Sequence, residues 1–441
     1  MLERIGHIHE PQQLFNESLP ALCYFTFDHA ATYLSHPETR RLQVLCNRTA
    51  DSLLVSLFER PDIEPTSTDV ADHEYFQKFI QDHDLPCLNV TAPWPLSTVR
   101  IAKPWGAEIW YTGIEARGVC TVSGMPLPWL TDLLPESIIG QATGSAPLLL
   151  KILDPLPDQS LGDLYFELHE KKIEVYVVTQ VDRQAWPDGI GKIRYGFNQE
   201  LRKTFASDDQ FRKGYLDAVT HYQQVRNQID EFLNQSREAA DYSASAEVPA
   251  NLMQSWLQKV PAELAEQEAA RKAEMNQFTA LRDISVGDVI TVDPFFPHSL
   301  QHGVRVIEFQ TASYERYILS FGQKVLTQNH WDTEVGVAEA ILDLPNESAL
   351  RQLAGPEGVT IELIADFSAF KVIRITITPG HGYGLGNDPD YKIVIGVSGA
   401  ARLDGVDIKP ERALLLPIDT RKGSQLSSIT GAVLLIAQPK P

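Results

Sequence analysis

The chain of 441 residues is poor in cysteine, with only Cys23, Cys46, Cys87 and Cys120, and none of these forms a C-x-x-C pair. Disulfide frameworks need many cysteines in a short chain, and zinc fingers need closely spaced pairs. Neither is therefore expected to organise this protein. Scattered cysteines of this kind are typical of a reducing compartment, so we predict a cytoplasmic protein.

Long apolar runs and a basic surplus are also missing. No stretch approaches the roughly 20 apolar residues of a membrane helix, and the N-terminal residues MLERIGHIHEPQQ do not resemble a secretory signal. The chain has 38 basic and 58 acidic residues, a formal charge of −20. Nucleic acids and anionic membranes bind basic surfaces, so neither is expected as a partner. A phosphorylated ligand would need a local basic patch, and the sequence leaves the oligomeric state open.

What the chain does contain is a polar motif in residues 162–174, GDLYFELHEKKIE. Side chains alternate across a strand, so Glu167 and His169 point to one face and their apolar neighbours to the other. If the chain then reverses, Glu174 lies opposite His169 in a hairpin, with Cβ atoms roughly 5 Å apart. The motif therefore predicts three polar side chains that converge on one face.

A second motif lies far along the chain, in residues 287–298, GDVITVDPFFPH. It predicts a strand from Val289, a turn at the prolines, and His298 at the end of a mostly apolar run. A single histidine of this kind is more often structural than a ligand. Two complementary half-sites in one chain nevertheless favour a shared metal site.

Imidazoles and carboxylates together suit a divalent transition metal, with Zn²⁺ the leading candidate and Mn²⁺, Fe²⁺, Co²⁺ or Ni²⁺ as alternatives. A simpler interpretation is that Glu167, His169 and Glu174 form the solvent face of an amphipathic hairpin, with Lys171 and Lys172 as ionic partners.

Four segments resemble type I mannose-6-phosphate isomerases, over roughly residues 100 to 441. Lys103 to Gly106 is similar to the KPWG with which that family opens, and residues 147–156 (PLLLKILDPL) to its PFLxKxL segment. Residues 174–198 resemble its E-x-W-Y strand, and residues 287–298 its G-D-V to His motif. This resemblance implies a metal-dependent sugar-phosphate isomerase.

The resemblance also implies roles for individual residues. The metal ligands would be Glu167, His169, Glu174 and His298. The family has glutamine where this chain has Glu167, and the added negative charge would weaken the Lewis acidity of the metal. The family also has a long insertion between the positions of His169 and Glu174, where this chain has only four residues.

Three further residues have catalytic roles by the same resemblance. Lys151 and Arg316 would stabilise developing negative charge, and Glu308 is the candidate base. Each has a simpler explanation, since Arg316 could form an exposed ion pair with Glu315, and Lys151 could lie at a strand edge.

We expect a mainly β protein with a helical insertion, a double jelly-roll (bicupin) with an N-terminal extension. Its four parts are predicted to be an extension of unknown role, a metal-binding cupin barrel, a helical insertion, and a degenerate C-terminal barrel that retains one histidine, His381. Their ranges are, in the same order, 1–95; 96–198 together with 281–345; 199–280; and 346–441.

The expected activity is interconversion of mannose 6-phosphate and fructose 6-phosphate, or a related sugar phosphate. The main alternative is a non-catalytic sugar-binding or regulatory cupin, because one fold hosts several functions. An isomerase or oxygenase that acts on another small molecule is a third possibility.

Overall fold

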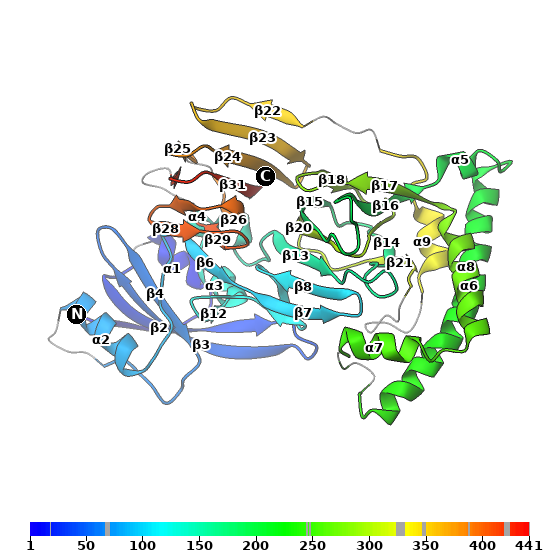
Figure 1. Ribbon diagram of the computed structural model, residues 1–441. Helices are drawn as coiled ribbons and strands as arrows, with labels where there is room; N and C mark the ends of the chain where they lie inside the picture. The colour runs from blue at the N-terminus through cyan, green and yellow to red at the C-terminus, as the bar shows by residue number, and fades with distance from the viewer. Residues whose placement is uncertain are drawn as a thin grey trace. The chain divides into compact units, whose positions relative to one another are not determined.

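The computed structural model is mostly β, with a helical insertion (Figure 1). It describes residues 1–17, 19–66, 71–243, 246, 248–322, 331–345, 350–386, 389–418 and 424–440. The chain divides into two compact units. The first contains Met1–Val99, Trp110–Lys151 and Ala349–Pro441, and the second contains Arg100–Ile109 and Ile152–Ser348. The division into four parts stays a prediction.

The first unit begins with a five-stranded sheet in the order β1-β2-β3-β4-β5. The apolar runs near the N-terminus lie in its strands β2, β3 and β4. The elements up to α4 are β1 (Glu3–Ile8), α1 (Pro11–Glu17), β2 (Leu22–Ala31), β3 (Glu38–Arg48), β4 (Leu53–Phe58), α2 (Asp72–Asp82), β5 (Leu88–Asn89), β6 (Trp94–Ser97), β9 (Ile114–Glu115), β10 (Gly118–Val119), β11 (Thr121–Val122), β12 (Met125–Pro126), α3 (Leu127–Leu133) and α4 (Glu136–Ile139).

The C-terminal strands of the first unit enter a nine-stranded sheet, β12-β11-β6-β29-β26-β31-β24-β23-β22, and a four-stranded sheet, β25-β30-β27-β28. Apolar side chains from both sheets share one buried cluster, among them Ile375, Val394, Leu403 and Leu426. The strands are β22 (Arg351–Leu353), β23 (Val359–Asp366), β24 (Phe370–Ile377), β25 (His381–Gly384), β26 (Lys392–Gly399), β27 (Ala401–Leu403), β28 (Val406–Ile408), β29 (Ala413–Leu416), β30 (Gln425–Ser428) and β31 (Ala432–Pro439).

Two further sheets form the β part of the second unit, in the orders β18-β15-β20-β13-β8-β7 and β17-β16-β19-β14-β21. Tyr176 and Val306 of the first sheet share a buried core with Ile193 and Leu300 of the second, so the two sheets enclose one interior. The strands are β7 (Val99–Lys103), β8 (Gly106–Trp110), β13 (Leu149–Pro155), β14 (Phe166–Leu168), β15 (Glu174–Val181), β16 (Gly191–Phe197), β17 (Thr279–Ile284), β18 (Val289–Val292), β19 (His298–Leu300), β20 (Val304–Gln310) and β21 (Tyr317–Ser320).

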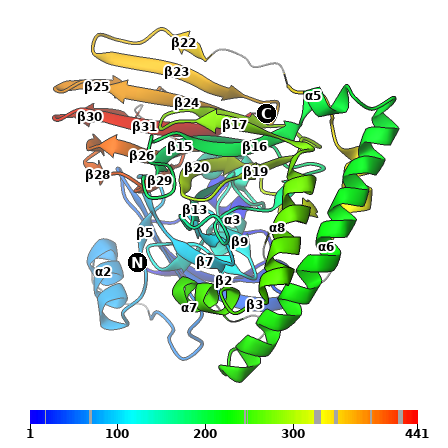
Figure 2. The same ribbon diagram turned by 45° about the vertical axis from the view of Figure 1, so that its right-hand side comes forward.

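The helices of this unit are α5 (Gln199–Arg202), α6 (Asp208–Ala239), α7 (Ala250–Leu257), α8 (Ala262–Asn276) and α9 (Thr333–Glu339). Side chains of α6, α8 and α9 pack on the five-stranded sheet, α7 packs against the end of α6, and Figure 2 shows α6 and α8 side by side. The side chain of Ser207 caps the start of α6, and Phe211, Tyr215 and Tyr222 form its buried stripe. The helical insertion expected from the sequence is therefore confirmed, and it packs against the strands that hold the candidate metal ligands. Among the described residues, no helix is both long and apolar enough to cross a membrane.

Candidate metal centre

Strand β14 supplies the first candidate ligands, and its alternation is as predicted. Phe166 and Leu168 pack against Tyr215 and its neighbours in α6. Glu167 faces the opposite way, into the interior between the sheets. It lies directly across from His298 in the pairing of β14 with β19. Because paired residues of adjacent strands share a face, the two distant motifs meet at this pair.

The predicted hairpin is wrong. Glu174 begins β15, which pairs with β18 and β20 in the six-stranded sheet, whereas β14 belongs to the five-stranded sheet. The segment between His169 and Glu174 therefore crosses from one sheet to the other. The two side chains still converge, because their sheets face the same interior. Nε2 of His169 lies 3.6 Å from Oε1 of Glu174.

The two histidines present the same nitrogen to the centre. Nδ1 of His169 bonds to the backbone carbonyl of Glu315 at 2.9 Å, and Nδ1 of His298 bonds to that of Phe296 at 3.1 Å. A carbonyl only accepts hydrogen bonds, so Nδ1 of His169 carries the proton and its Nε2 keeps a lone pair. Nε2 of His298 has two polar neighbours, the hydroxyl of Tyr176 at 3.0 Å and Oε2 of Glu174 at 3.1 Å. Burial, followed by the charge of Lys172, holds the pKa of His169 well below its usual range. A neutral imidazole fixed in this tautomer is the metal-binding form.

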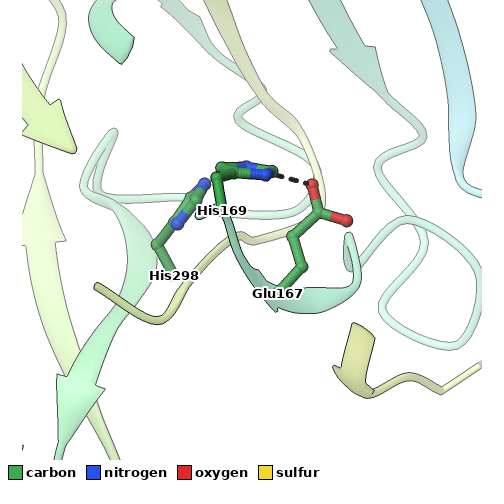
Figure 3. A group of neighbouring side chains, drawn as sticks. All are labelled: Glu167, His169 and His298. Atoms are coloured by element: carbon green, nitrogen blue, oxygen red, sulfur yellow. Dashed lines mark ion pairs between the residues drawn. The ribbon is translucent and has the colours of Figure 1, made fainter. Parts of the chain in front are cut away.

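Glu167, His169 and His298 form a group whose ligand atoms all lie within 4.8 Å of one another (Figure 3). Oε1 of Glu167 is 3.8 Å from Nε2 of His169, and Figure 3 shows the ring of His169 directed at that carboxylate, with the ring of His298 on the other side of His169. Nε2 of His169 is buried without a hydrogen-bond partner among the described residues, and Oε2 of Glu167, likewise without a hydrogen bond, lies 3.5 Å from Nη1 of Arg316. Burying such atoms is costly unless something binds them.

Glu174 completes the polar cluster but already has partners. Its Oε1 lies 2.6 Å from Nζ of Lys172, and its Oε2 accepts a hydrogen bond from the hydroxyl of Tyr176 at 2.7 Å. The same Oε2 is 3.1 Å from Nε2 of His298. Burial alone would raise the pKa of Glu174, but Lys172 and the two histidines hold it well below its ordinary value. Glu174 is therefore a buried carboxylate with a buried ammonium beside it.

Arg316 adds a second positive charge at the edge of the cluster. Its Nη1 lies 3.5 Å from Oε2 of Glu167, and its guanidinium sits over the ring of Tyr165, 5.2 Å from the centroid. The alternative of an exposed ion pair with Glu315 is wrong. The Glu315 carboxylate instead accepts hydrogen bonds from three consecutive backbone amides, those of residues 170 to 172.

Glu308 and Lys151, the other two candidate catalytic residues, lie on neighbouring strands of the six-stranded sheet. Glu308 in β20 is fully buried and is the direct cross-strand partner of Tyr176. Because Tyr176 bonds to Glu174, Glu308 shares the face that looks toward the cluster. Lys151 is buried in β13 and is the last residue of the segment Trp110–Lys151 of the first unit.

Tyr176 and Glu315 are the site residues that the sequence reasoning missed. Lys172 is an ionic partner of Glu174, as the simpler interpretation of the motif has it, but the pair is buried and does not lie on a solvent face. Lys172 precedes Glu174 by two positions, a spacing that predicts a shared face. Tyr176 follows Glu174 by the same interval. Glu315 had no signal, because its partners are backbone amides of a segment more than 140 residues away in sequence.

The donor set fits a divalent metal ion. Two imidazoles and a carboxylate are ligands that Zn²⁺ and its neighbours in the transition series accept, and Nε2 of His169 has no hydrogen-bond partner among the described residues. Metal-binding histidines usually form a hydrogen bond from the other ring nitrogen to a carboxylate or a backbone carbonyl, and here each Nδ1 lies beside a backbone carbonyl. The chain thus holds three side chains able to bind one ion, with Glu174 adjacent.

Solved structures of mannose-6-phosphate isomerases are similar to this chain, and they establish the fold. The enzyme from Bacillus subtilis matches with a TM-score of 0.55 and 15% identity, over 78% of this chain and 99% of its own. A single-residue variant of phosphomannose isomerase from Salmonella typhimurium gives 0.51 and 13%, over 79% and 100%. The metal-free form from the same organism gives 0.50 and 12%, with the same coverage. The resemblance inferred from the sequence motifs is therefore confirmed at the level of the fold.

No protein-family model matches the chain, and no curated protein matches it either. The similarity lies in the arrangement of the backbone, with few identical side chains.

Proposed function

We propose that this protein is a metal-dependent aldose–ketose isomerase that interconverts mannose 6-phosphate and fructose 6-phosphate or a related sugar phosphate. The observation that carries the proposal is the pair of imidazoles whose Nε2 atoms face Glu167 in one buried interior. The fold of this chain, shared with solved mannose-6-phosphate isomerases, supports the choice of reaction.

Glu167, His169, Glu174 and His298 would hold the ion, with Zn²⁺ as the first candidate. A bound divalent ion supplies Lewis acidity toward a sugar oxygen. The contact of Nδ1 of His169 with the Glu315 carbonyl leaves its Nε2 able to bind an ion without rearrangement. Lys172 keeps Glu174 ionised at neutral pH, so this carboxylate needs no deprotonation before it can bind an ion.

The reaction requires a proton to leave C2 of the aldose and to arrive at C1, with a second proton shifted between the two oxygens. Glu308 is the candidate for the carbon-bound proton because its carboxylate is buried and shares the face of Tyr176. Arg316 and Lys151 are candidates to stabilise the negative charge that develops on oxygen. Arg316 is suited to this by its position beside Glu167, where it also offsets that extra carboxylate.

Proton exchange with solvent tests this proposal. Zinc-loaded protein incubated with mannose 6-phosphate in heavy water should place deuterium in the recovered sugar phosphates, since a general base exchanges part of its proton with solvent. Arg316→Ala should suppress the incorporation by about a hundredfold while the metal content stays unchanged, because the residue stabilises charge and is not a ligand. Arg402→Ala, an exposed arginine of the first unit, is the control and should behave as wild type.

A non-catalytic sugar-binding cupin is the second candidate, and one observation favours it. Lys172 and Tyr176 satisfy Glu174 without any metal, so this carboxylate does not need an ion for its burial. Binding of mannose 6-phosphate to fully metallated protein, with no deuterium incorporated and no ketose formed, would support this candidate and refute the isomerase.

A further inference from the structure

A cavity of about 170 Å³ lies within the second unit, and its lining residues differ from the candidate metal ligands. The C-terminal half of α6 and the helix α7 form one side, and β7 with the residues after β13 forms the other (Figure 1). Figure 2 shows α7 beside β7 in a second view. None of the described residues that line the cavity belongs to the candidate metal centre.

The lining is positively charged. Arg100, Lys103, Arg226 and Arg237 all contribute to it, and no acidic residue is among the described residues that line it. The chain as a whole has a formal charge of −20. Two of these cations have carboxylate partners outside the lining, since Lys103 pairs with Glu108 at 3.0 Å and Arg226 with Asp230 at 2.6 Å. The lining still has an excess of positive charge, a local reversal of the overall charge, and an anion inside it would be attracted at short range.

The two buried arginines are held in position by their own contacts. Arg226 pairs with Asp230 at 2.6 Å and donates to the carbonyl of Gly322 at 2.8 Å. Arg237 donates to the carbonyls of Ser243 and Ala246 at 3.0 and 2.6 Å. Both side chains are about 5% exposed. Guanidinium groups fixed in this way are organised before any ligand arrives, which lowers the entropic cost of binding.

Most of the rest of the wall is apolar. Its larger apolar side chains are Leu156, Leu161, Leu233, Val248, Met253 and Leu257. A ligand that binds both the cationic and the apolar side chains of the lining needs an anionic group for the arginines and a compact apolar body. An apolar cavity of roughly 150 Å³ holds a benzene ring, so the body is about one ring in size.

We propose that this cavity binds a small organic phosphate at a site separate from the metal centre. Guanidinium groups bond both carboxylate and phosphate in a bidentate manner, but phosphate fits better here because its double charge and three terminal oxygens suit several cations at once. The proposal does not depend on isomerase activity, because its residues are distinct from the candidate ligands and catalytic groups.

Calorimetric titration of phenyl phosphate into EDTA-treated protein tests this site, since the probe combines phosphate with one apolar ring. We expect one probe per chain, an affinity at least about tenfold lower in Arg237→Gln, and no change in the exposed control Arg402→Gln. The ligand-centre variant His298→Ala should bind as wild type. Met253→Ser should weaken phenyl phosphate more than inorganic phosphate, because only the first uses the apolar wall.

Thermal unfolding checks that each variant is folded. If Arg237→Gln does not fold, Arg100→Gln replaces it, because Arg100 lines the cavity and is exposed. The proposal is overturned if wild type does not bind the probe, or if Arg237→Gln and Arg100→Gln bind it as tightly as wild type. Loss of binding in His298→Ala alone would overturn it as well, since the anion would then belong to the metal centre.

Discussion

Replacing Lys172 with methionine should reveal how the cluster is neutralised. The variant keeps the length of the side chain but removes the ammonium that lies 2.6 Å from Glu174. With an effective dielectric constant of about 20, Coulomb's law gives an attraction of roughly 6 kcal/mol at this distance. Part of it offsets the desolvation of two buried groups. Removing one partner of a buried pair typically costs about 3 to 5 kcal/mol, and we expect a loss of this size in the free energy of unfolding.

Metal should reverse much of this loss, because a divalent ion beside Glu174 replaces the missing positive charge. Urea unfolding of wild type and Lys172→Met, each with EDTA and with excess zinc, measures the effect. Zinc should stabilise the variant more than it stabilises wild type. The matched control is Lys171→Met, an exposed neighbour with the same substitution, which should change the free energy of unfolding by less than about 0.5 kcal/mol.

Two results would refute this reasoning. If Lys172→Met and Lys171→Met are equally stable in EDTA, the buried ion pair contributes nothing to folding. If zinc stabilises wild type and Lys172→Met to the same extent, the ion does not bind next to Glu174.

Three other changes probe the same region. His169→Ala should bind zinc at least about tenfold more weakly than wild type, measured by elemental analysis and competition titration. The control His381→Ala, in the first unit, should bind zinc as wild type does. An equal loss of zinc in both variants would show that the ion binds elsewhere. Glu167→Gln should keep the metal and hold or raise turnover, and a fall of about a hundredfold, roughly 2.7 kcal/mol in the barrier, would show that this carboxylate itself transfers a proton. Burial alone would raise the pKa of Asp163, but its hydrogen bond with His302 lowers it below the ordinary value. Asp163 therefore stabilises the fold above about pH 4, and this contribution is lost as pH falls through the lower folded-state pKa. Urea unfolding from about pH 6 to pH 2 should show Asp163→Asn less stable at the upper end and the difference shrinking toward the lower end; a constant difference would contradict the assignment.

The alternation of apolar and polar residues along β14 predicted the orientation of Glu167 correctly. Glu167 points inward because Phe166 and Leu168 find an apolar partner in α6, and strand alternation alone gives this result. The same pattern failed for Glu174, where a short connection between two polar residues was read as a hairpin. A hairpin and a crossing between two facing sheets can use the same number of residues, and only the pairing partners of β15 distinguish them.

The sequence by itself determined the strands, the inserted helices and the two motifs that supply imidazoles and carboxylates, because each depends on periodicities of two or about 3.6 residues along the chain. The tertiary structure decided what surrounds them. Lys172 is a buried partner of Glu174, and the carboxylate of Glu315 accepts hydrogen bonds from the backbone of the segment between β14 and β15. Arginines of α6 line a cavity together with residues of β7. These contacts join residues far apart in sequence, and their energies depend on burial and distance, which no local pattern contains.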